Sequence, residues 1–586
     1  MSHPQSAAVR WLLGQLRLHG VDWLLVCPGS RSTPLVQAAV EIEAEGYWRI
    51  EVVADERQAG FAALGLARVG RHPAVLTTSG SAVAHLLPAC VEAGETATAL
   101  LLLTADRPPA LRDCGAPQTV RQPLLLASYA RVVDLDVSGG VTADQASQAQ
   151  IGLKHWQCGG LVHLNVCLDT PLALQSDAAV PWAGERNSAS PLAASPMETS
   201  LRDRAIVGLP TCELRSSIAP PALGERVIVI VGPLPCHATL AEWMPQLCAR
   251  GLVLAEWPSQ LAAAAASSGA PRTYDALLRD PGLLERLRPD RIVRVGEWPA
   301  SKGLQLLLEQ ARPLGIAVHA AWGARRSDPL HHVDLATYER PEVALAEWCN
   351  SADPGVEKWR SLWFAADSAA RAAAESVPAQ HWELGAVRTL VANLAANTNV
   401  IVGNSMAVRD LDALNLHPRH CARIVCSRGA NGIDGTLAMA WGAAIGTAAP
   451  TRAYLGDCTF LHDIGSLQLI ATHHRQLDLR VLVIDNDGGA IFDYLPARSA
   501  MAPQTHERLF TAQHGLDLVK IARGFGLDAQ RVTTEAELRQ AWTCPGQGVR
   551  VVIFQVDRAT SFQLHRQWQG AQIGAAVAAL AQLEPC

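Results

Sequence analysis

The stretch Asp22–Leu35, "DWLLVCPGSRSTPL", joins a short apolar run to a turn. The apolar run predicts a buried strand, Pro28-Gly29 predicts a tight turn, and a helix is expected to follow. In open α/β sheets, ligand sites lie just beyond such strand ends. Arg31 stands there between two serines, where a cation has no obvious packing role. The stretch therefore predicts an α/β sheet whose edge serves a function.

Similar strand-like runs recur along the 586 residues, in three groups at 23–166, 226–323 and 399–557. Most are nearly continuous apolar runs, which suit strands buried on both faces of a parallel sheet. Ala- and Leu-rich segments between them suit crossover helices. We therefore predict an α/β protein of three doubly wound parallel-sheet domains. The predicted domains are 1–184, 221–350 and 381–586, joined by linkers at 185–220 and 351–380.

The composition limits the kinds of binding partner and the cellular compartment that we expect for this protein. The 49 Lys and Arg against 55 Asp and Glu give a net charge of −6, which argues against non-specific binding to nucleic acid or membrane surfaces. The 14 cysteines form no CxxC pair, so we expect buried, reduced thiols. The sequence has no signal-peptide pattern and no apolar run of the ~18 residues needed to span a membrane. We expect a cytoplasmic protein.

Two strand ends in the third group carry oxygen ligands. "YLGD" (454–457) ends one strand, and "VLVIDNDGGAIF" (481–492) ends the next. Asp457 and Asn486 are 29 residues apart, about one strand–helix–strand unit, so both should lie at the same sheet edge. With a carbonyl of the glycine turn at Gly488, they form a set of hard oxygen ligands that suits Mg²⁺. Plain turns are the alternative interpretation, but their order and spacing favour a metal site.

Glu56 lies at another strand end, before an Ala- and Gly-rich segment. A lone glutamate there is most often a charge favoured by the helix dipole. Together with Asp457 and Asn486, however, it resembles the pattern of thiamine-diphosphate enzymes. The resemblance implies that Asp457, Asn486 and the Gly488 carbonyl hold Mg²⁺ or Mn²⁺ on the diphosphate. It also implies that Glu56 hydrogen-bonds the aminopyrimidine ring from the neighbouring subunit, in a homodimer or homotetramer.

Longer segments are similar to one family of these enzymes, the MenD family of menaquinone biosynthesis. The segments are "CPGSRSTPL" (27–35), "DERQAGFAALGLAR" (55–68), "LTTSGSAVAHLLPACVEA" (76–93), "LTADRPPALRDCGAPQTVRQ" (103–122), "GNSMAVRDLD" (403–412) and "SRGANGIDGTLA" (427–438). The match is dense in the first and third groups and thin in the middle one. It implies decarboxylation of 2-oxoglutarate and addition of the resulting succinyl carbanion to isochorismate.

The resemblance also implies the site residues, with Glu56 as the catalytic one. The implied substrate contacts are Ser30, Arg31, Arg107, Gln118, Lys302, Ser405, Arg409, Arg428, Phe492 and Leu495. The implied cofactor contacts are Glu56, Thr78, Ser79, Gly80, Arg428, Gly429, Gly456, Asp457, Cys458, Asn486, Gly488, Ile491 and Phe492. Arginines suit substrate carboxylates because they donate bidentate, charge-assisted hydrogen bonds. Four positions depart from the family pattern. Cys458 replaces a frequent glycine, Gly303 follows Lys302 where some relatives have arginine, Pro117 stands before Gln118 where an asparagine can occur, and Asp487 follows Asn486 where some members have another asparagine.

Two other functions remain open from the sequence. A thiamine-dependent decarboxylase or carboligase of the acetolactate-synthase type would handle monoanions and need fewer arginines. A non-catalytic protein with this fold need not keep Glu56, Asp457 and Asn486 together. A Rossmann NAD enzyme is disfavoured because no GxGxxG follows an early strand.

Overall fold

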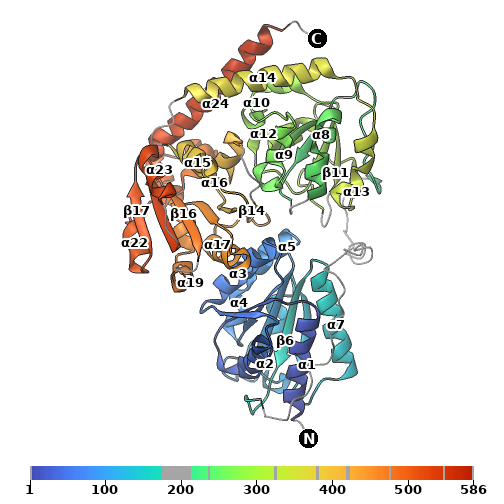
Figure 1. The fold of residues 1–586 in the computed structure, drawn as a ribbon, viewed down its shortest axis with the longest axis vertical. Coiled ribbons are helices and arrows are strands. Elements are labelled where there is room, and N and C mark those ends of the chain that lie inside the picture. Colours follow the sequence, from blue (N-terminus) through green and yellow to red (C-terminus); the bar gives the residue numbers. More distant parts are fainter. Residues whose placement is uncertain are drawn as a thin grey trace. The chain divides into compact units, whose positions relative to one another are not determined.

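The computed structural model describes residues 3–174, 213–234, 238–321, 326–377, 382–416, 423–473, 477–544 and 548–583. The chain divides into two compact units (Figure 1). Unit 1 comprises Met1–Val207, Ser427–Ala448 and His462–Leu477. Unit 2 comprises Gly208–Cys426, Ala449–Leu461 and Asp478–Cys586.

Unit 1 contains a six-stranded sheet of order β2-β1-β3-β4-β6-β5, in which every neighbouring pair is parallel. Its strands are β1 (Trp23–Val26), β2 (Arg49–Val52), β3 (Pro73–Thr77), β4 (Leu100–Asp106), β5 (Arg131–Asp136) and β6 (Leu161–Cys167). The four inner strands are buried along their whole length, whereas the edge strand β2 is partly exposed. The continuous apolar runs thus become inner strands of a parallel sheet.

Helices cover both faces of this sheet. They are α1 (Pro4–Leu18), α2 (Thr33–Ala44), α3 (Glu56–Arg68), α4 (Ser81–His85), α5 (Leu87–Glu95), α6 (Gln122–Leu125), α7 (Ala143–Gln157), α17 (Thr436–Thr447) and α19 (Ser466–Thr472), with the 3-10 turn η1 (Ser30–Ser32). α1, α2 and α7 share one apolar core with the strands. α3 packs closely on α17, since a Cβ at Gly442 would lie 2.1 Å from the carbonyl oxygen of Ala62.

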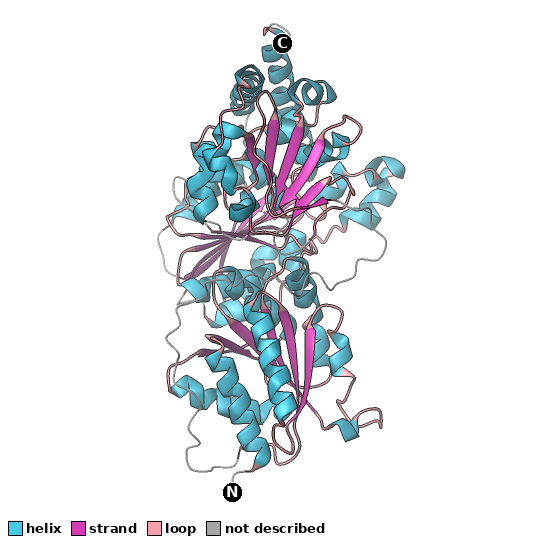
Figure 2. Ribbon diagram, turned by 90° about the vertical axis from the view of Figure 1, so that its right-hand side faces the viewer, coloured by secondary structure: helices cyan, strands magenta, loops and turns pink. Residues whose placement is uncertain are grey.

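Unit 2 contains two further six-stranded sheets, also parallel throughout. The order β7-β12-β11-β10-β8-β9 uses β7 (Glu213–Leu214), β8 (Val227–Val231), β9 (Leu252–Ala255), β10 (Arg291–Val295), β11 (Ala317–Ala321) and β12 (Leu335–Thr337). The order β14-β13-β15-β16-β18-β17 uses β13 (Asn399–Val402), β14 (Arg423–Cys426), β15 (Thr451–Gly456), β16 (Asp478–Asp485), β17 (Asp528–Val532) and β18 (Gly548–Gln555). Figure 2 shows the sheets in magenta among cyan helices.

The helices of unit 2 pack against these two sheets. Those with the central sheet are α8 (Ala238–Arg250), α9 (Ala262–Ser267), α10 (Tyr274–Leu277), α11 (Pro281–Leu287), α12 (Lys302–Ala311), α13 (Pro341–Ala344) and α14 (Glu357–Ser376). The rest are α15 (Glu383–Ala392), α16 (Met406–Leu414), α18 (Asp457–His462), α20 (Ala497–Ala500), α21 (Pro503–His506), α22 (Leu518–Gly524), α23 (Glu535–Thr543) and α24 (Arg558–Ala581), with the turns η5 (Ala490–Tyr494) and η6 (Glu507–Thr511). The two longest, α14 and α24, pack against each other (Figure 1).

The prediction of three parallel α/β domains is confirmed by these three sheets. The predicted linker at 185–220 lies mostly outside the described residues, and its described end contains β7. The predicted linker at 351–380 contains α14, so the domain boundaries stay predictions. The described cysteines are free thiols, but Cys114, Cys158 and Cys544 are exposed, so the expectation of buried thiols is wrong for these three. Among the described residues, no helix has the length and hydropathy of a membrane span.

Candidate active site

The predicted oxygen ligands of unit 2 meet at one sheet edge. β15 and β16 are parallel neighbours, with Gly456 opposite Ile484, so the residues that follow both strands lie side by side. Asp457 Oδ2 accepts the backbone N–H of Asn486 at 3.1 Å and that of Gly488 at 2.9 Å. The Asp457 side chain is buried. We call Asp457, Asn486 and Gly488 the Asp457 cradle.

The donor set of the Asp457 cradle fits a divalent cation. Asn486 Oδ1 is buried and has no hydrogen-bond partner among the described residues, which is costly unless a ligand satisfies it. Gly488 has φ +134°, and a Cβ there would lie 2.2 Å from the Thr511 carbonyl oxygen, so only glycine permits this turn. A carboxylate, an amide oxygen and a turn carbonyl are ligands that Mg²⁺ accepts. These residues could therefore hold the predicted metal ion.

Cys458, which stands where relatives often have glycine, orients Asp457 through its backbone N–H. Its N–H donates to Asp457 Oδ1 at 2.6 Å, so the replacement of glycine leaves the orientation of Asp457 intact. Burial, together with the negative charge of Asp457, raises the pKa of the Cys458 thiol to about 12. The thiol is neutral at physiological pH and adds no charge to the cradle.

His514 is a neighbour of the cradle that the sequence did not reveal. Its Nε2 lies 3.4 Å from Asp457 Oδ2 and 3.8 Å from Asp485 Oδ1. Burial and the nearby Asp457 raise the pKa of Asp485. His514 Nε2 thus lies between two buried carboxylates and within hydrogen-bond distance of Asp457. It follows Asp457 by 57 residues, and no local motif marks it.

Two candidate substrate residues of unit 2 follow one strand at this same edge. β13 pairs with β15 in parallel, and Ser405 and Arg409 follow β13 at the start of α16 and within it. Arg409 Nη1 donates to the Ser405 carbonyl oxygen, and both residues are partly exposed. The structure therefore places two candidate substrate contacts at the sheet edge that carries the Asp457 cradle.

The apolar candidates of η5 lie at the surface rather than in the core. Ile491 and Phe492 are half-buried, and Leu495 is 43% exposed. The Phe492 ring contacts that of Phe510 edge-on, with centroids 5.5 Å apart. These side chains remain available to line a ligand site.

Lys302 stands apart from the other candidates of unit 2. It begins α12 beside the central sheet, where its Nζ lies 3.0 Å from Glu309 Oε1 in a partly exposed ion pair. A Cβ at Gly303 would lie 2.5 Å from the Asp275 carbonyl oxygen. An arginine after Lys302 would therefore clash with this backbone, so the glycine is required here. The role of Lys302 stays a prediction.

In unit 1, candidate residues from three segments converge on one guanidinium group. Arg107, directly after β4, donates through Nη1 to Ser79 Oγ and, at 2.7 Å, to the Gln118 carbonyl oxygen. Gln118 Nε2 donates in turn to the Ser79 carbonyl oxygen at 3.0 Å. Gly80 has φ +86°, and its Cβ would lie 2.7 Å from Gln118 Cγ. Arg107 is therefore fixed before any ligand binds.

Arg31 lies close enough to Arg107 for their charges to interact. Its Nη1 donates to the Leu168 carbonyl oxygen at 2.9 Å. Its buried Nε has no partner among the described residues. Burial and the charge of Arg107 both lower the pKa of Arg31, a cost that a bound anion would relieve. We call Arg31 and Arg107 the arginine pair; Ser30, on the same turn, is exposed.

The same turn packs on another candidate, Thr78. A Cβ at Gly29 would lie 2.2 Å from that of Thr78, so glycine allows the two segments to approach. Thr78 is buried.

Glu56 is the first residue of α3, but it does not cap the helix. Asp55 is the N-cap and accepts the N–H groups of Arg57 and Gln58. The Glu56 side chain is half-buried and makes no hydrogen bond or ion pair to another described residue. Since Asp55 accepts the backbone N–H groups at the start of α3, the Glu56 carboxyl group remains available for a ligand.

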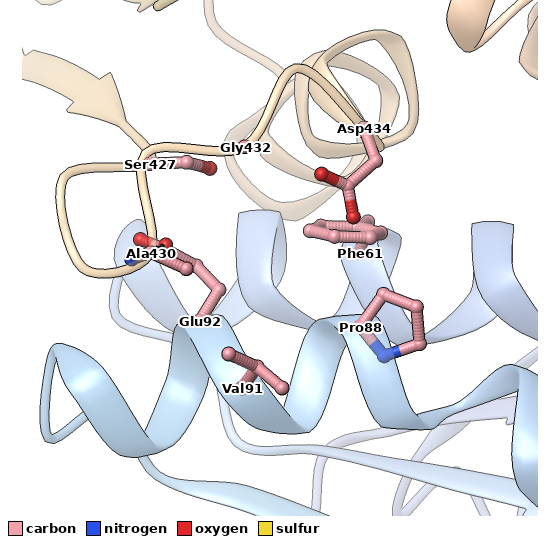
Figure 3. A pocket seen from close by; sticks show the side chains of 8 residues that line it. All are labelled: Phe61, Pro88, Val91, Glu92, Ser427, Ala430, Gly432 and Asp434. Carbon is pink, nitrogen blue, oxygen red and sulfur yellow. Dashed lines mark hydrogen bonds between the residues drawn. The ribbon is translucent and has the colours of Figure 1, made fainter.

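Glu92 is a second residue that sequence reasoning missed. Its buried carboxylate accepts the N–H groups of Gly429 at 3.1 Å and Ala430 at 2.8 Å, and it pairs with Arg68 at 3.3 Å. Figure 3 shows Glu92 beneath the loop of Ser427, Ala430 and Gly432, beside a cavity of about 230 Å³. Glu92 therefore fixes the loop that carries the candidates Arg428 and Gly429.

Comparisons with known proteins agree with this arrangement. The model of the thiamine pyrophosphate enzyme N-terminal TPP binding domain matches residues 7–125, and that of the C-terminal TPP binding domain matches residues 412–550. The first range contains Glu56 and the arginine pair, and the second contains the Asp457 cradle. The chain thus contains both domains that bind thiamine pyrophosphate in this enzyme class.

Curated relatives match almost the whole chain, and three of them are each named 2-succinyl-5-enolpyruvyl-6-hydroxy-3-cyclohexene-1-carboxylate synthase. The Chloroflexus aurantiacus protein is 36% identical over 88% of this chain and 88% of its own. The Synechococcus elongatus protein is 34% identical over 92% of this chain and 91% of its own. The Myxococcus xanthus protein is 33% identical over 97% of this chain and 98% of its own. The chain therefore belongs to the 2-succinyl-5-enolpyruvyl-6-hydroxy-3-cyclohexene-1-carboxylate synthase family of thiamine-diphosphate enzymes.

Proposed function

We propose that this protein joins 2-oxoglutarate to isochorismate in menaquinone biosynthesis. The reaction releases CO₂ and yields 2-succinyl-5-enolpyruvyl-6-hydroxy-3-cyclohexene-1-carboxylate. Membership of the family supports this assignment. Within the structure, the supporting observation is the Asp457 cradle. Its Asn486 Oδ1, which has no partner among the described residues, lies at the sheet edge that also carries Ser405 and Arg409. The chain is a transferase that uses thiamine diphosphate.

The cofactor and its metal ion would occupy the Asp457 cradle. Bound thiamine diphosphate supplies the electron sink that makes loss of CO₂ from a 2-oxo acid feasible. The Asp457 carboxylate, Asn486 Oδ1 and the Gly488 carbonyl oxygen would hold Mg²⁺ or Mn²⁺ against the diphosphate. Further proposed cofactor contacts are Thr78, Ser79, Gly80, Arg428, Gly429, Gly456, Cys458, Ile491 and Phe492.

Glu56 is proposed to act on a proton of the cofactor. Its carboxyl group would donate a hydrogen bond to a ring nitrogen of the aminopyrimidine and stabilise the imino tautomer. The free position of Glu56 at the start of α3 supports this role, because Asp55 already caps the helix.

The arginines are proposed to bind the substrate carboxylates. Both substrates are dianions, and Arg31, Arg107, Arg409 and Arg428 would each offer charge-assisted donors. Arg107 is held in place by Ser79 and Gln118, which lowers the cost of ordering it when substrate binds. Ile491, Phe492 and Leu495 would exclude water from the reacting carbon. Ser30, Gln118, Lys302 and Ser405 complete the proposed polar contacts.

We further propose a cytoplasmic homodimer, or a tetramer of two such dimers. In it, Glu56 of one subunit and the Asp457 cradle of the other would serve one cofactor. Light scattering on active enzyme tests this proposal. A dimer or tetramer is expected, and a fully active monomer would contradict it.

Mass spectrometry of the reaction product tests the function itself. Purified protein is incubated with isochorismate, 2-oxoglutarate, thiamine diphosphate and Mg²⁺, and a parallel reaction contains pyruvate in place of 2-oxoglutarate. We expect the succinylated cyclohexene carboxylate only with 2-oxoglutarate. Release of CO₂ from pyruvate alone would favour the acetolactate-synthase alternative, and absence of product in both reactions would refute the assignment.

A further inference from the structure

The C-terminal helix α24 lies beyond residue 550, where the match to the C-terminal TPP binding domain ends. Its first half nevertheless contacts two elements of unit 2 that carry candidate substrate residues. These elements are α16, with Arg409, and η5, with Phe492.

The contact with α16 is a partly buried hydrogen bond between an imidazole and a carboxyl group. His565 Nε2 lies 3.1 Å from Asp410 Oδ1, and Asp410 is the residue next to Arg409. The Asp410 carboxylate is 3% exposed, and its other oxygen has no partner among the described residues. His565 is therefore the residue that compensates this buried carboxylate.

The imidazole of His565 is held on its other side as well. Nδ1 lies 2.9 Å from the Ser561 carbonyl oxygen, which accepts from a protonated ring, and 2.8 Å from the Trp382 indole nitrogen, which donates to a neutral ring. Burial lowers the pKa of His565, but Asp410 and Glu383 outweigh it and raise that pKa to about 9. Glu383 also accepts from the Ser561 hydroxyl. The ring thus has a partner for Nδ1 in either protonation state.

The contact with η5 involves aromatic rings and an ion pair, and Arg558 forms a second ion pair with η6. The Tyr494 ring lies 4.9 Å from that of Phe562 and 5.8 Å from that of His565, measured between centroids. Arg558 lies 3.3 Å from Asp493 and 2.6 Å from Glu507. The first turns of α24 therefore join η5 and α16 to a single support.

We infer that α24 positions the substrate-binding residues, and that His565, acting through Asp410, holds α16 so that Ser405 and Arg409 face the substrate. α16 has only 9 residues, and its N-cap Ser405 has φ +65°, a strained conformation that the surroundings must maintain. The inference rests on the proposed function where it names Arg409 as a contact for substrate carboxylates. His565 itself touches no reacting group and is a positioning residue.

α16 has a second anchor, which makes the inference testable. Asp412 Oδ1 accepts the Trp257 N–H at 3.2 Å and the Tyr274 hydroxyl at 3.0 Å. Because this anchor does not involve α24, a change at His565 is expected to displace α16 without unfolding it.

The test compares His565→Ala and His565→Gln with the control Gln567→Ala, a change at an exposed position of the same helix. Steady-state kinetics should show the KM for at least one of 2-oxoglutarate and isochorismate raised about tenfold in His565→Ala, with kcat within about threefold of wild type. His565→Gln keeps a donor toward Asp410 and should fall between His565→Ala and wild type. Gln567→Ala should match wild type.

Hydrogen exchange followed by mass spectrometry gives a second readout that needs no activity. Amides of 405–414 should exchange faster in His565→Ala than in wild type, while those of β15 and β16 should not change. Unchanged KM values with unchanged exchange at 405–414 would overturn the inference. So would a loss confined to kcat, or faster exchange across the whole sheet. If wild-type enzyme forms no product, the proposed function fails, and the exchange experiment still decides whether His565 holds α16.

Discussion

The Asp457 cradle and the arginine pair lie just after the carboxyl ends of strands in two different sheets, but they are built differently. In the cradle, backbone N–H groups of one turn orient the Asp457 carboxylate. In the arginine pair, long side chains are oriented by carbonyl oxygens of Leu168 and Gln118, which belong to other segments. The cradle is thus a local property of two neighbouring strands, whereas the arginine pair depends on how the whole sheet of unit 1 assembles.

Because they are built differently, the Asp457 cradle and the arginine pair suit different ligands. The cradle presents oxygens to a cation at positions fixed by the backbone. The arginine pair presents cationic donors to carboxylates and carries the cost of holding two like charges close together. Changes in the cradle should therefore abolish cofactor binding, whereas changes in the arginine pair should weaken substrate binding alone.

The largest effect is expected for Asp457→Asn. The variant loses the charge that would hold the metal ion, so kcat/KM should fall by about 10³-fold or more, the equivalent of several kcal/mol of lost stabilisation by the metal. Calorimetry should show no uptake of thiamine diphosphate with Mg²⁺. Asp528→Asn, at an exposed ion pair, serves as the control. Near-normal activity of Asp457→Asn would remove the cradle from the mechanism.

A smaller and more selective effect is expected for Arg31→Lys. Lysine keeps the charge but lacks the Nε–H that has no partner among the described residues, so the KM for a carboxylate substrate should rise about 10-fold, or ~1.4 kcal/mol. Binding of thiamine diphosphate, measured by calorimetry, should not change. Arg121→Lys, at an exposed ion pair, should behave as wild type. A parallel loss of cofactor binding would show that the two regions are not separate in function.

Glu92→Gln tests whether the Arg428 loop depends on its buried support. Glutamine retains one acceptor and turns an NH₂ group toward the other backbone N–H, leaving a buried donor unsatisfied at about 1–3 kcal/mol. We expect kcat/KM to fall about tenfold and the thermal midpoint to drop by a few degrees. Glu45→Gln, at a partly exposed ion pair, is the control. Wild-type kinetics in Glu92→Gln would show that the loop does not need this carboxylate.

The last effect concerns the stability of the sheet that carries the arginine pair, and not the activity of either site. His163 is fully buried in β6, its Nε2 lies 2.7 Å from Thr104 Oγ1, and burial lowers its pKa from 6.5 to about 4. The unfolded chain therefore takes up a proton between pH 6.5 and 4 that the folded chain does not. Above pH 6.5 the free energy of unfolding keeps the whole contribution of His163. As the pH falls toward 4, the free energy of unfolding decreases by up to about 3 kcal/mol.

Thermal unfolding at pH 7 and pH 5 measures this loss. The midpoint of the wild type should drop at pH 5, and that of His163→Gln should drop less. An equal drop in both proteins would assign the acid sensitivity to other groups.

The sequence revealed the parts that follow strand ends. Continuous apolar runs predicted parallel sheets, and parallel strands end at a common edge, so the spacing of Asp457 and Asn486 placed both in the cradle. Residue type and motif likewise singled out Arg107 and Gln118, which the structure brings together.

The supporting residues could not be predicted in the same way. Glu92 accepts the N–H of Gly429, which is 337 residues away in the sequence. His514 and Asp457 are 57 residues apart in the sequence, and His565 and Asp410 are 155 residues apart. Each acts through a contact that only the assembled fold creates. A lone glutamate or histidine in a helix or loop carries no local signal of such a partner. Lys302 forms an ion pair with Glu309, and its role as a substrate contact stays a prediction.

The most direct test of the account is calorimetric titration of thiamine diphosphate into the wild-type protein with Mg²⁺ and with a chelator. The Asp457 cradle predicts saturable, stoichiometric binding in Mg²⁺ and its loss when the metal is removed. Equal binding with and without the metal, or no binding in Mg²⁺, would contradict the assignment of the Asp457 cradle as the metal and diphosphate site.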